Sequence, residues 1–64
     1  MQTGIIKKWE HGAGWGFIEC DDGEDYFFNV AQVRQGQKMR VGLRVKFDSY
    51  EGQRGPEAEN VSIV

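Results

Sequence analysis

The sequence has a single cysteine, a single proline and no long hydrophobic run. Cys20 alone cannot form an internal disulfide or supply the thiolates of a zinc site, so a reducing cytoplasm is the simplest compartment. Without a stretch of about 20 apolar residues there is no candidate for a membrane-spanning helix, and no signal-peptide pattern is present. We therefore expect a cytoplasmic protein that has no membrane partner.

An excess of basic residues is also missing. Eight Lys and Arg stand against ten Asp and Glu, which gives a formal net charge of −2 and a pI near 5.2. A protein that holds duplex DNA mainly through its phosphates is expected to be basic. Any affinity for nucleic acid must then come largely from ring stacking and a few local cations.

Candidate catalytic residues are few. His11 is the one histidine, and no second imidazole or thiolate stands at metal-ligand spacing. The carboxylates of segment 21–25 flank Gly23 and are typical of a turn rather than of a catalytic pair. The glycines of segment 12–16 precede neither a helix nor a Lys-Ser/Thr pair, which disfavours a phosphate-binding loop. We predict that the protein is not an enzyme and has no cofactor, metal or small-molecule substrate.

The composition predicts one small β domain that spans residues 1–64, because 39% of the residues are hydrophobic and nine are glycine. The expected strands are 2–10, 15–19, 25–28, 44–49 and 59–64. The sequence Asp-Asp-Gly at 21–23 predicts a hairpin, segment 50–56 a loop, and segment 31–33 one helical turn. Five short strands in so short a chain favour closure into a barrel, which removes the open edges.

Aromatic residues stand on the second and third expected strands. Because side chains alternate between the faces of a strand, Trp15 and Phe17 share one face and Ile18 takes the other. With Ile18 inward, Trp15, Phe17 and Phe27 form an exposed aromatic platform of the kind that stacks unpaired bases. The alternative, that these rings are core, conflicts with the number of apolar residues already expected inside. Those inward residues are Ile6, Ile18, Tyr26, Phe28, Val45, Phe47, Val61 and Ile63.

Cations accompany the rings on the first strand. Strict alternation places Lys7 and Trp9 on the platform face, opposite Ile6. A cation beside a ring suits a stacking site that follows a phosphate backbone. Lys8 is then expected at the rim, and Arg54 in a glycine-rich loop. The alternative for all three cations is an ordinary solvated surface.

These residues resemble the bacterial cold shock proteins, single-domain OB-fold proteins that bind single-stranded RNA and DNA. The motifs that carry the resemblance are GIIK at 4–7, GWGFI at 14–18, DYFFNV at 25–30 and GQRGPEAENV at 52–61. Together they cover nearly the whole chain. The resemblance implies an all-β, five-stranded antiparallel Greek-key barrel of the OB type, and the family's acidic pI agrees with that of this chain.

Departures from the family concern the binding face. KKWE at 7–10 stands where the family usually has KWFN, so Trp9 is expected to replace the family's tryptophan as a stacking residue. Ala13 stands where a lysine is usual, and Asn29 and Val30 stand where a stacking histidine and phenylalanine are usual. The loop 34–42 is shorter than usual and lacks its customary aromatic residue.

The resemblance carries a binding role to seven positions: Lys7, Trp9, Trp15, Phe17, Asp25, Phe27 and Arg54. Lys8 joins them at the rim, and Asn29 joins them as a hydrogen-bonding contact only. We predict a monomer that binds single-stranded RNA or DNA with low sequence preference and acts as an RNA chaperone. The alternative is a small barrel that binds a protein partner through the same aromatic face and has lost most of its nucleic-acid affinity.

Overall fold

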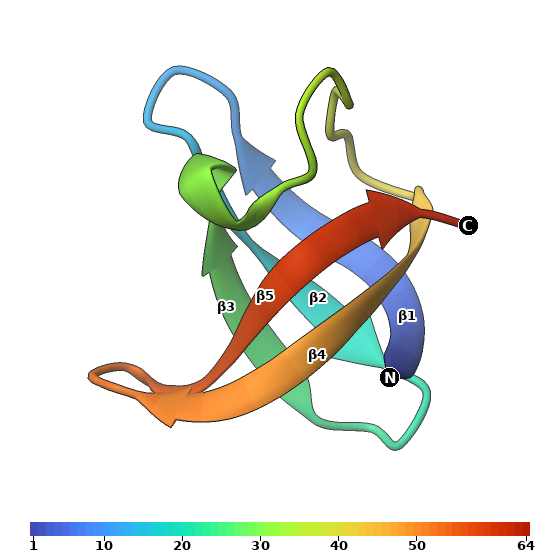
Figure 1. The fold of residues 1–64 in the computed structure, drawn as a ribbon, viewed down its shortest axis with the longest axis vertical. Coiled ribbons are helices and arrows are strands. Elements are labelled where there is room, and N and C mark those ends of the chain that lie inside the picture. Colours follow the sequence, from blue (N-terminus) through green and yellow to red (C-terminus); the bar gives the residue numbers. More distant parts are fainter.

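Turn residues divide the chain into five strands. In a computed structural model of residues 1–64, these strands form a closed barrel (Figure 1). The elements are β1 Gln2–Glu10, β2 Trp15–Cys20, β3 Asp25–Asn29, the 3-10 turn η1 Val30–Gln32, β4 Arg44–Gly52 and β5 Gly55–Ile63. Hydrogen-bonded neighbours follow the order β1-β2-β3-β5-β4. The predicted all-β class and the closed five-stranded barrel are confirmed.

Four of the five strand pairings are antiparallel, and the fifth is parallel. The parallel contact joins β3 to β5 at the pair Phe27 and Glu57 and closes the barrel. The sequence pattern did not predict a parallel pairing, because β3 and β5 are not consecutive in the chain and no turn sequence links them. This contact matters for the site, since it brings the β4–β5 hairpin beside β3.

The core consists of ten buried residues inside the barrel: Ile6, Ile18, Cys20, Tyr26, Phe28, Met39, Val45, Phe47, Ala58 and Val61. Seven of the eight predicted inward residues are among them. Ile63 is the exception, because its side chain is 38% exposed. Asn60 has a left-handed φ of 54°, and Val61 and Ser62 are both buried in succession. The alternation in β5 is therefore broken, and Ile63 points outward.

Of two predicted connecting segments, one differs in the structure and the other is present one residue earlier than predicted. Segment 50–56 was expected to be a loop, but β4 and β5 continue through it and leave only Gln53 and Arg54 as the turn. Gly55 completes this turn with a φ of 89°, a value that favours glycine. The expected helical turn is present as η1, and the Asn29 side chain caps it by accepting a hydrogen bond from the Ala31 amide at 2.9 Å.

A β-bulge in β1 determines which side chains reach the outer surface. Opposite β2, Ile6 pairs with Ile18 but Lys8 pairs with Phe17, so Lys7 is an extra residue. An extra residue reverses the alternation beyond it. Lys7 and Lys8 are both exposed, whereas Trp9 turns toward the core. Gly16 lies opposite Trp9, and any side-chain Cβ there would collide with the Lys8 carbonyl.

Two features of other protein classes do not occur in this structure. None of its helical segments has the length and apolar character needed to cross a membrane. No group of three or more His, Cys, Asp or Glu side chains is placed to hold a metal ion.

Candidate nucleic-acid interface

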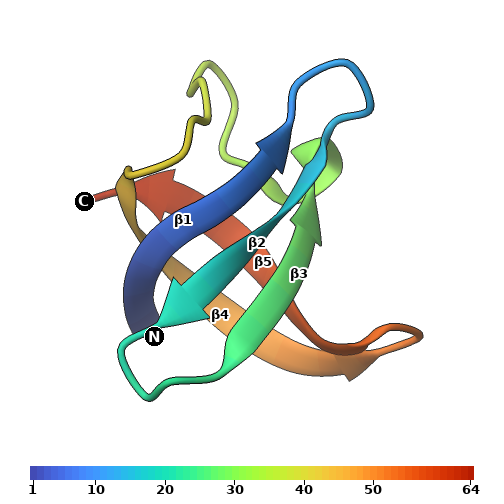
Figure 2. The ribbon, with the colours of Figure 1, turned by 180° about the vertical axis from the view of Figure 1, so that it is seen from behind.

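Three aromatic rings lie together on the outer face of β2 and β3, the two strands seen beside β1 in Figure 2. Phe17 and Phe27 are direct cross-strand partners. Their ring centroids are 5.7 Å apart at 73°, and Trp15 lies 6.1 Å from each of them. None of the three belongs to the core. We call Trp15, Phe17 and Phe27 the aromatic cluster, and its outward placement is as predicted.

The exposure of the cluster is less than the sequence predicted. Trp15 and Phe17 are half-buried, and Phe27 is only 7% exposed. The expectation that Phe27 is an open platform is therefore wrong for the unbound protein. The reason is its contact with the two other rings and with the Arg54 guanidinium, whose central carbon lies 4.6 Å from the Phe27 ring centroid.

Together these four side chains line a shallow pocket of about 400 Å³. It is open on the solvent side, so a flat base can reach the Trp15 and Phe17 rings without a change in the backbone. The pocket is mostly apolar, and Arg54 is its one charged residue. An aromatic floor with a cation at its edge suits a ligand that has a π-face and a nearby negative charge.

The β4–β5 hairpin holds Arg54 in this place. The Glu57 carboxylate accepts hydrogen bonds from the Arg54 backbone amide at 3.1 Å and from the Tyr50 hydroxyl at 2.9 Å. These two contacts lower the pKa of Glu57, the Arg54 amide contributing most. Gly52 gives the carboxylate its space, since a side chain there would collide with it. Sequence reasoning missed Glu57 and Tyr50, which become visible only when the register of the hairpin is known.

The two lysines of the β-bulge border the cluster on the β1 side. Lys8 Nζ lies 5.1 Å from the Trp15 ring centroid and 3.7 Å from a Glu10 carboxylate oxygen. Lys7 Nζ lies 2.6 Å from the Asp25 carboxylate, and that hydrogen bond raises the pKa of Lys7. The structure therefore brings Lys7, Lys8 and Asp25 to the same face.

Trp9 does not lie on that face. Its indole stacks on the core residue Phe28, with ring centroids 5.4 Å apart and an interplanar angle of 17°. The predicted placement of Trp9 on the platform is wrong, because strict alternation ignored the extra residue Lys7. Lys8, and not Trp9, is the residue of β1 that lies over Trp15 on this face. Asn29 is opposite Trp15 in the β2–β3 register, where it caps η1.

The likeness to known proteins extends along nearly the whole chain. The family model described as "'Cold-shock' DNA-binding domain" matches residues 2–64. The cold shock-like protein CspLB of Listeria monocytogenes serovar 1/2a is 40% identical over 65 residues, with 97% of each chain covered. The cold shock-like protein CspD of Bacillus cereus is 41% identical over 64 residues, with the same coverage.

A solved structure gives the same fold. The drosophila Unr CSD456 structure matches with a TM-score of 0.81 over 98% of this chain, at 18% sequence identity. The match covers 26% of that longer chain.

Proposed function

Because this chain belongs to the cold shock domain family, we propose that it binds single-stranded RNA or DNA on the outer face of β1, β2 and β3. Bases leave their own stack and restack on the aromatic cluster, while cations at its border meet the phosphates. Binding of this kind keeps RNA unpaired, which is the action of an RNA chaperone. No covalent chemistry is involved, and the protein acts as a monomer.

The observation that carries the proposal is the composition of the shallow pocket. Three rings and one guanidinium form it, with no carboxylate among its lining residues. Stacking of a base on an aromatic side chain contributes about 1–3 kcal/mol and is tolerant of sequence. A net charge of −2 does not oppose such binding strongly, because the contact depends on ring surface rather than on total charge.

Arg54 has two roles in this proposal. In the unbound protein its guanidinium covers Phe27. When a base arrives, the guanidinium either stacks on the far side of the base or moves to a phosphate, and Phe27 becomes available. The hairpin keeps the Arg54 backbone fixed through Glu57, so only the side chain has to move and the entropic cost of binding stays small.

Affinity should be weaker than is usual in the family. Lys8, Asn29 and Val30 occupy three positions where the family usually has aromatic or imidazole rings. Each missing platform costs about 1–3 kcal/mol when nothing compensates. The cation of Lys8 compensates in part, since it can meet a phosphate.

A titration of fluorescently labelled oligonucleotides tests the proposal. Single strands of DNA and RNA are compared with the matched duplex at low and at moderate salt. We expect the single strands to bind and the duplex to bind more weakly, because a paired base cannot present its face to a ring. Equal affinity for duplex contradicts the stacking mechanism. Absence of all binding contradicts the function and favours a protein partner for the same face.

A further inference from the structure

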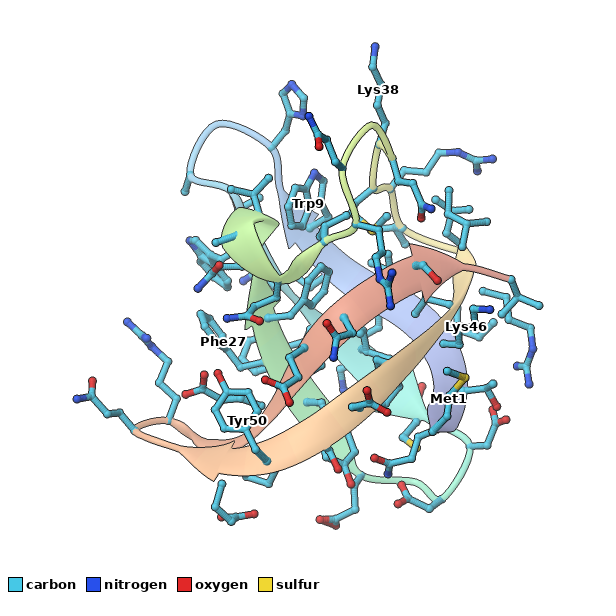
Figure 3. The ribbon with its side chains drawn as sticks, viewed as in Figure 1. Met1, Trp9, Phe27, Lys38, Lys46 and Tyr50 are labelled. Atoms are coloured by element: carbon cyan, nitrogen blue, oxygen red, sulfur yellow. The ribbon has the colours of Figure 1, made fainter.

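A second pocket, of about 430 Å³, opens at one end of the barrel. It lies between the turn that follows β1 and the segment around Lys38, and both Trp9 and Met39 line it. Figure 3 shows Trp9 below these two loops, with its indole nitrogen on the loop side and Lys38 extending outward above it. We call this the end pocket. Its volume lies within the range of pockets that bind small organic groups.

Trp9, a residue that lines the end pocket, carries an unused hydrogen-bond donor. Trp9 Nε1 is buried, and no acceptor in the protein contacts it. The indole ring is stacked on Phe28, which favours this orientation of the N–H. A buried donor without an acceptor is destabilising. An incoming group that offers an acceptor therefore gains more here than it would from an exposed donor.

Both walls of the end pocket are held by hydrogen bonds. The turn after β1 is closed by the Glu10 carbonyl, which accepts from the Gly14 amide at 2.7 Å. The opposite loop is tied to β5, because Gln37 Oε1 accepts from the Ile63 amide at 2.7 Å. Both walls are thus held in place before any ligand arrives. Since Nε1 itself is covered, the ligand reaches it only after side chains that line the pocket move.

The end pocket continues the aromatic cluster along β2. Gly14 and Val30 line the pocket, and the Gly14 carbonyl accepts a hydrogen bond from the Val30 amide at 2.7 Å. Gly14 directly precedes Trp15, and Val30 directly follows Asn29, the cross-strand partner of Trp15. A nucleic-acid strand that runs along β2 on the cluster and passes Trp15 therefore arrives at the end pocket next.

We propose that the end pocket takes one nucleobase of the bound strand edge first, and that the Trp9 Nε1–H donates a hydrogen bond to an acceptor on that edge. This inference rests on the proposed function. Lys38, which is exposed at the rim, meets the adjacent phosphate. Stacking on the cluster is indifferent to base identity, whereas a donor reads the atoms of the base edge. Trp9 would then be a specificity-determining residue at one nucleotide position.

The test uses a base analogue that changes only the edge. A short thymine oligonucleotide is compared with versions that carry 2,4-difluorotoluene at one position at a time. This analogue keeps the shape of thymine but replaces its carbonyl oxygens with fluorine, a poor acceptor, and its N3–H with C–H, so a Trp9 variant is needed to assign the lost hydrogen bond. For the parent protein we expect one position at which the analogue weakens binding by about tenfold, the size expected for a lost hydrogen bond in a buried site.

Two matched variants identify the donor. Trp9→Phe keeps a ring on Phe28 and removes the N–H, so the analogue at that position should bind within about twofold of thymine. Trp15→Phe removes the other indole N–H of the chain and serves as the control. It should lower overall affinity but keep the tenfold preference. The Trp9 indole N–H resonance of the parent should also move downfield when the thymine strand binds.

The outcomes separate this inference from the proposed function. If the strand binds and the Trp15 resonance responds, but no position prefers thymine and the Trp9 indole resonance is unchanged, the end pocket does not hold a base. That result overturns the inference and leaves the function intact. If neither resonance responds and no strand binds, both fail. If Trp9→Phe does not fold, the Trp9 indole N–H resonance of the parent protein still tests whether the end pocket holds a base.

Discussion

Phe27 illustrates at the residue scale how a ring can be buried and still lie on the outer face of the barrel. It is 7% exposed, yet it lies outside the core and is covered by the side chain of Arg54. Burial alone would classify it as a structural residue. Its neighbours indicate the opposite, since the two other rings of the aromatic cluster and the Arg54 guanidinium, not the core side chains, lie against it.

We expect Phe27→Ala to weaken single-strand binding by about 1–3 kcal/mol and to leave the barrel folded. The loss of affinity follows from the missing stacking surface. The fold should persist because the ten core residues do not include Phe27. Oligonucleotide titration measures the first effect, and circular dichroism with urea unfolding measures the second. Ile63→Ala, an exposed apolar residue of β5, is the control and should bind like the parent.

Lys8 and Trp9 are neighbours in the chain with opposite roles. Lys8 lies above Trp15 on the face that carries the aromatic cluster, and Trp9 packs on Phe28 at the core. Trp9→Ala should therefore lower the free energy of unfolding by about 3 kcal/mol, because it leaves a cavity. Lys8→Ala should leave it nearly unchanged, since an exposed ion pair contributes about 0–1 kcal/mol.

Measurements of nucleic-acid binding also distinguish Lys8→Ala from Trp9→Ala. Lys8→Ala should lower affinity and make the salt dependence shallower by about 0.7 in the slope of log K against log salt, which corresponds to one lost phosphate contact. Urea unfolding and titration at several salt concentrations measure the two quantities. A stable Trp9→Ala protein together with an unfolded Lys8→Ala protein would contradict the bulge at Lys7.

At the scale of elements, the β4–β5 hairpin is stabilised by a carboxylate whose pKa is lowered. Glu57 accepts hydrogen bonds from the Arg54 amide and the Tyr50 hydroxyl, and both favour its charged form. Its folded-state pKa lies below the ordinary value of 4.5. A group of this kind adds stability above its unfolded-state pKa and loses that contribution as the pH falls through the folded-state pKa.

We therefore expect the free energy of unfolding to fall as the pH is lowered below about 5, and Glu57→Gln to make this decline smaller. Asp21 also has a lowered pKa, because Arg44 hydrogen-bonds to it, so part of the decline should remain. Urea unfolding at a series of pH values gives the measurement. Glu51→Gln on the same strand is the control, since Glu51 is exposed. An identical pH profile for parent and Glu57→Gln would contradict the role of Glu57.

The elements could be predicted where local rules act alone. Alternation and turn residues placed β1, β2, β3 and seven core residues correctly. Alternation failed at Lys7 and Asn60, where a bulge and a left-handed residue reverse the inward face. Both depend on how two strands fit together, and no signal in a single strand reveals them. The strands of the β4–β5 hairpin were predicted too short for a related reason. The glycines there indicated a loop, but Gly52 makes room for the Glu57 side chain and Gly55 allows a tight turn.

At the scale of the whole molecule, the sequence predicted the composition of the site better than its geometry. Eight of the nine predicted residues lie on or beside the face that carries the cluster, and Trp9 is the one that turned inward. The coverage of Phe27 by Arg54 could not be predicted, because it requires the parallel contact between β3 and β5. The motifs thus predict which residues form the site, whereas the exposure of their side chains depends on how the barrel closes.

The charge distribution of the molecule leads to the last prediction, a shallow dependence of binding on salt. Three cations border the aromatic cluster, and two of them already have carboxylate partners: Lys7 with Asp25, and Lys8 with Glu10. Each neutralised phosphate of a single strand contributes about −0.7 to the slope of log K against log salt, so three contacts predict a slope near −2. Lys38 at the end pocket adds at most one further contact.

Titration of one single-stranded oligonucleotide between about 50 and 200 mM salt measures this slope. A slope steeper than about −5 would need about seven phosphate contacts, which is nearly all of the eight Lys and Arg of the chain. These residues do not share one face, since Arg44 is held by Asp21 on the side of the β2–β3 turn. So steep a slope would therefore show that phosphates dominate binding and would contradict stacking as its main source. A slope near −2 with strong preference for single strands is the result that the aromatic cluster requires.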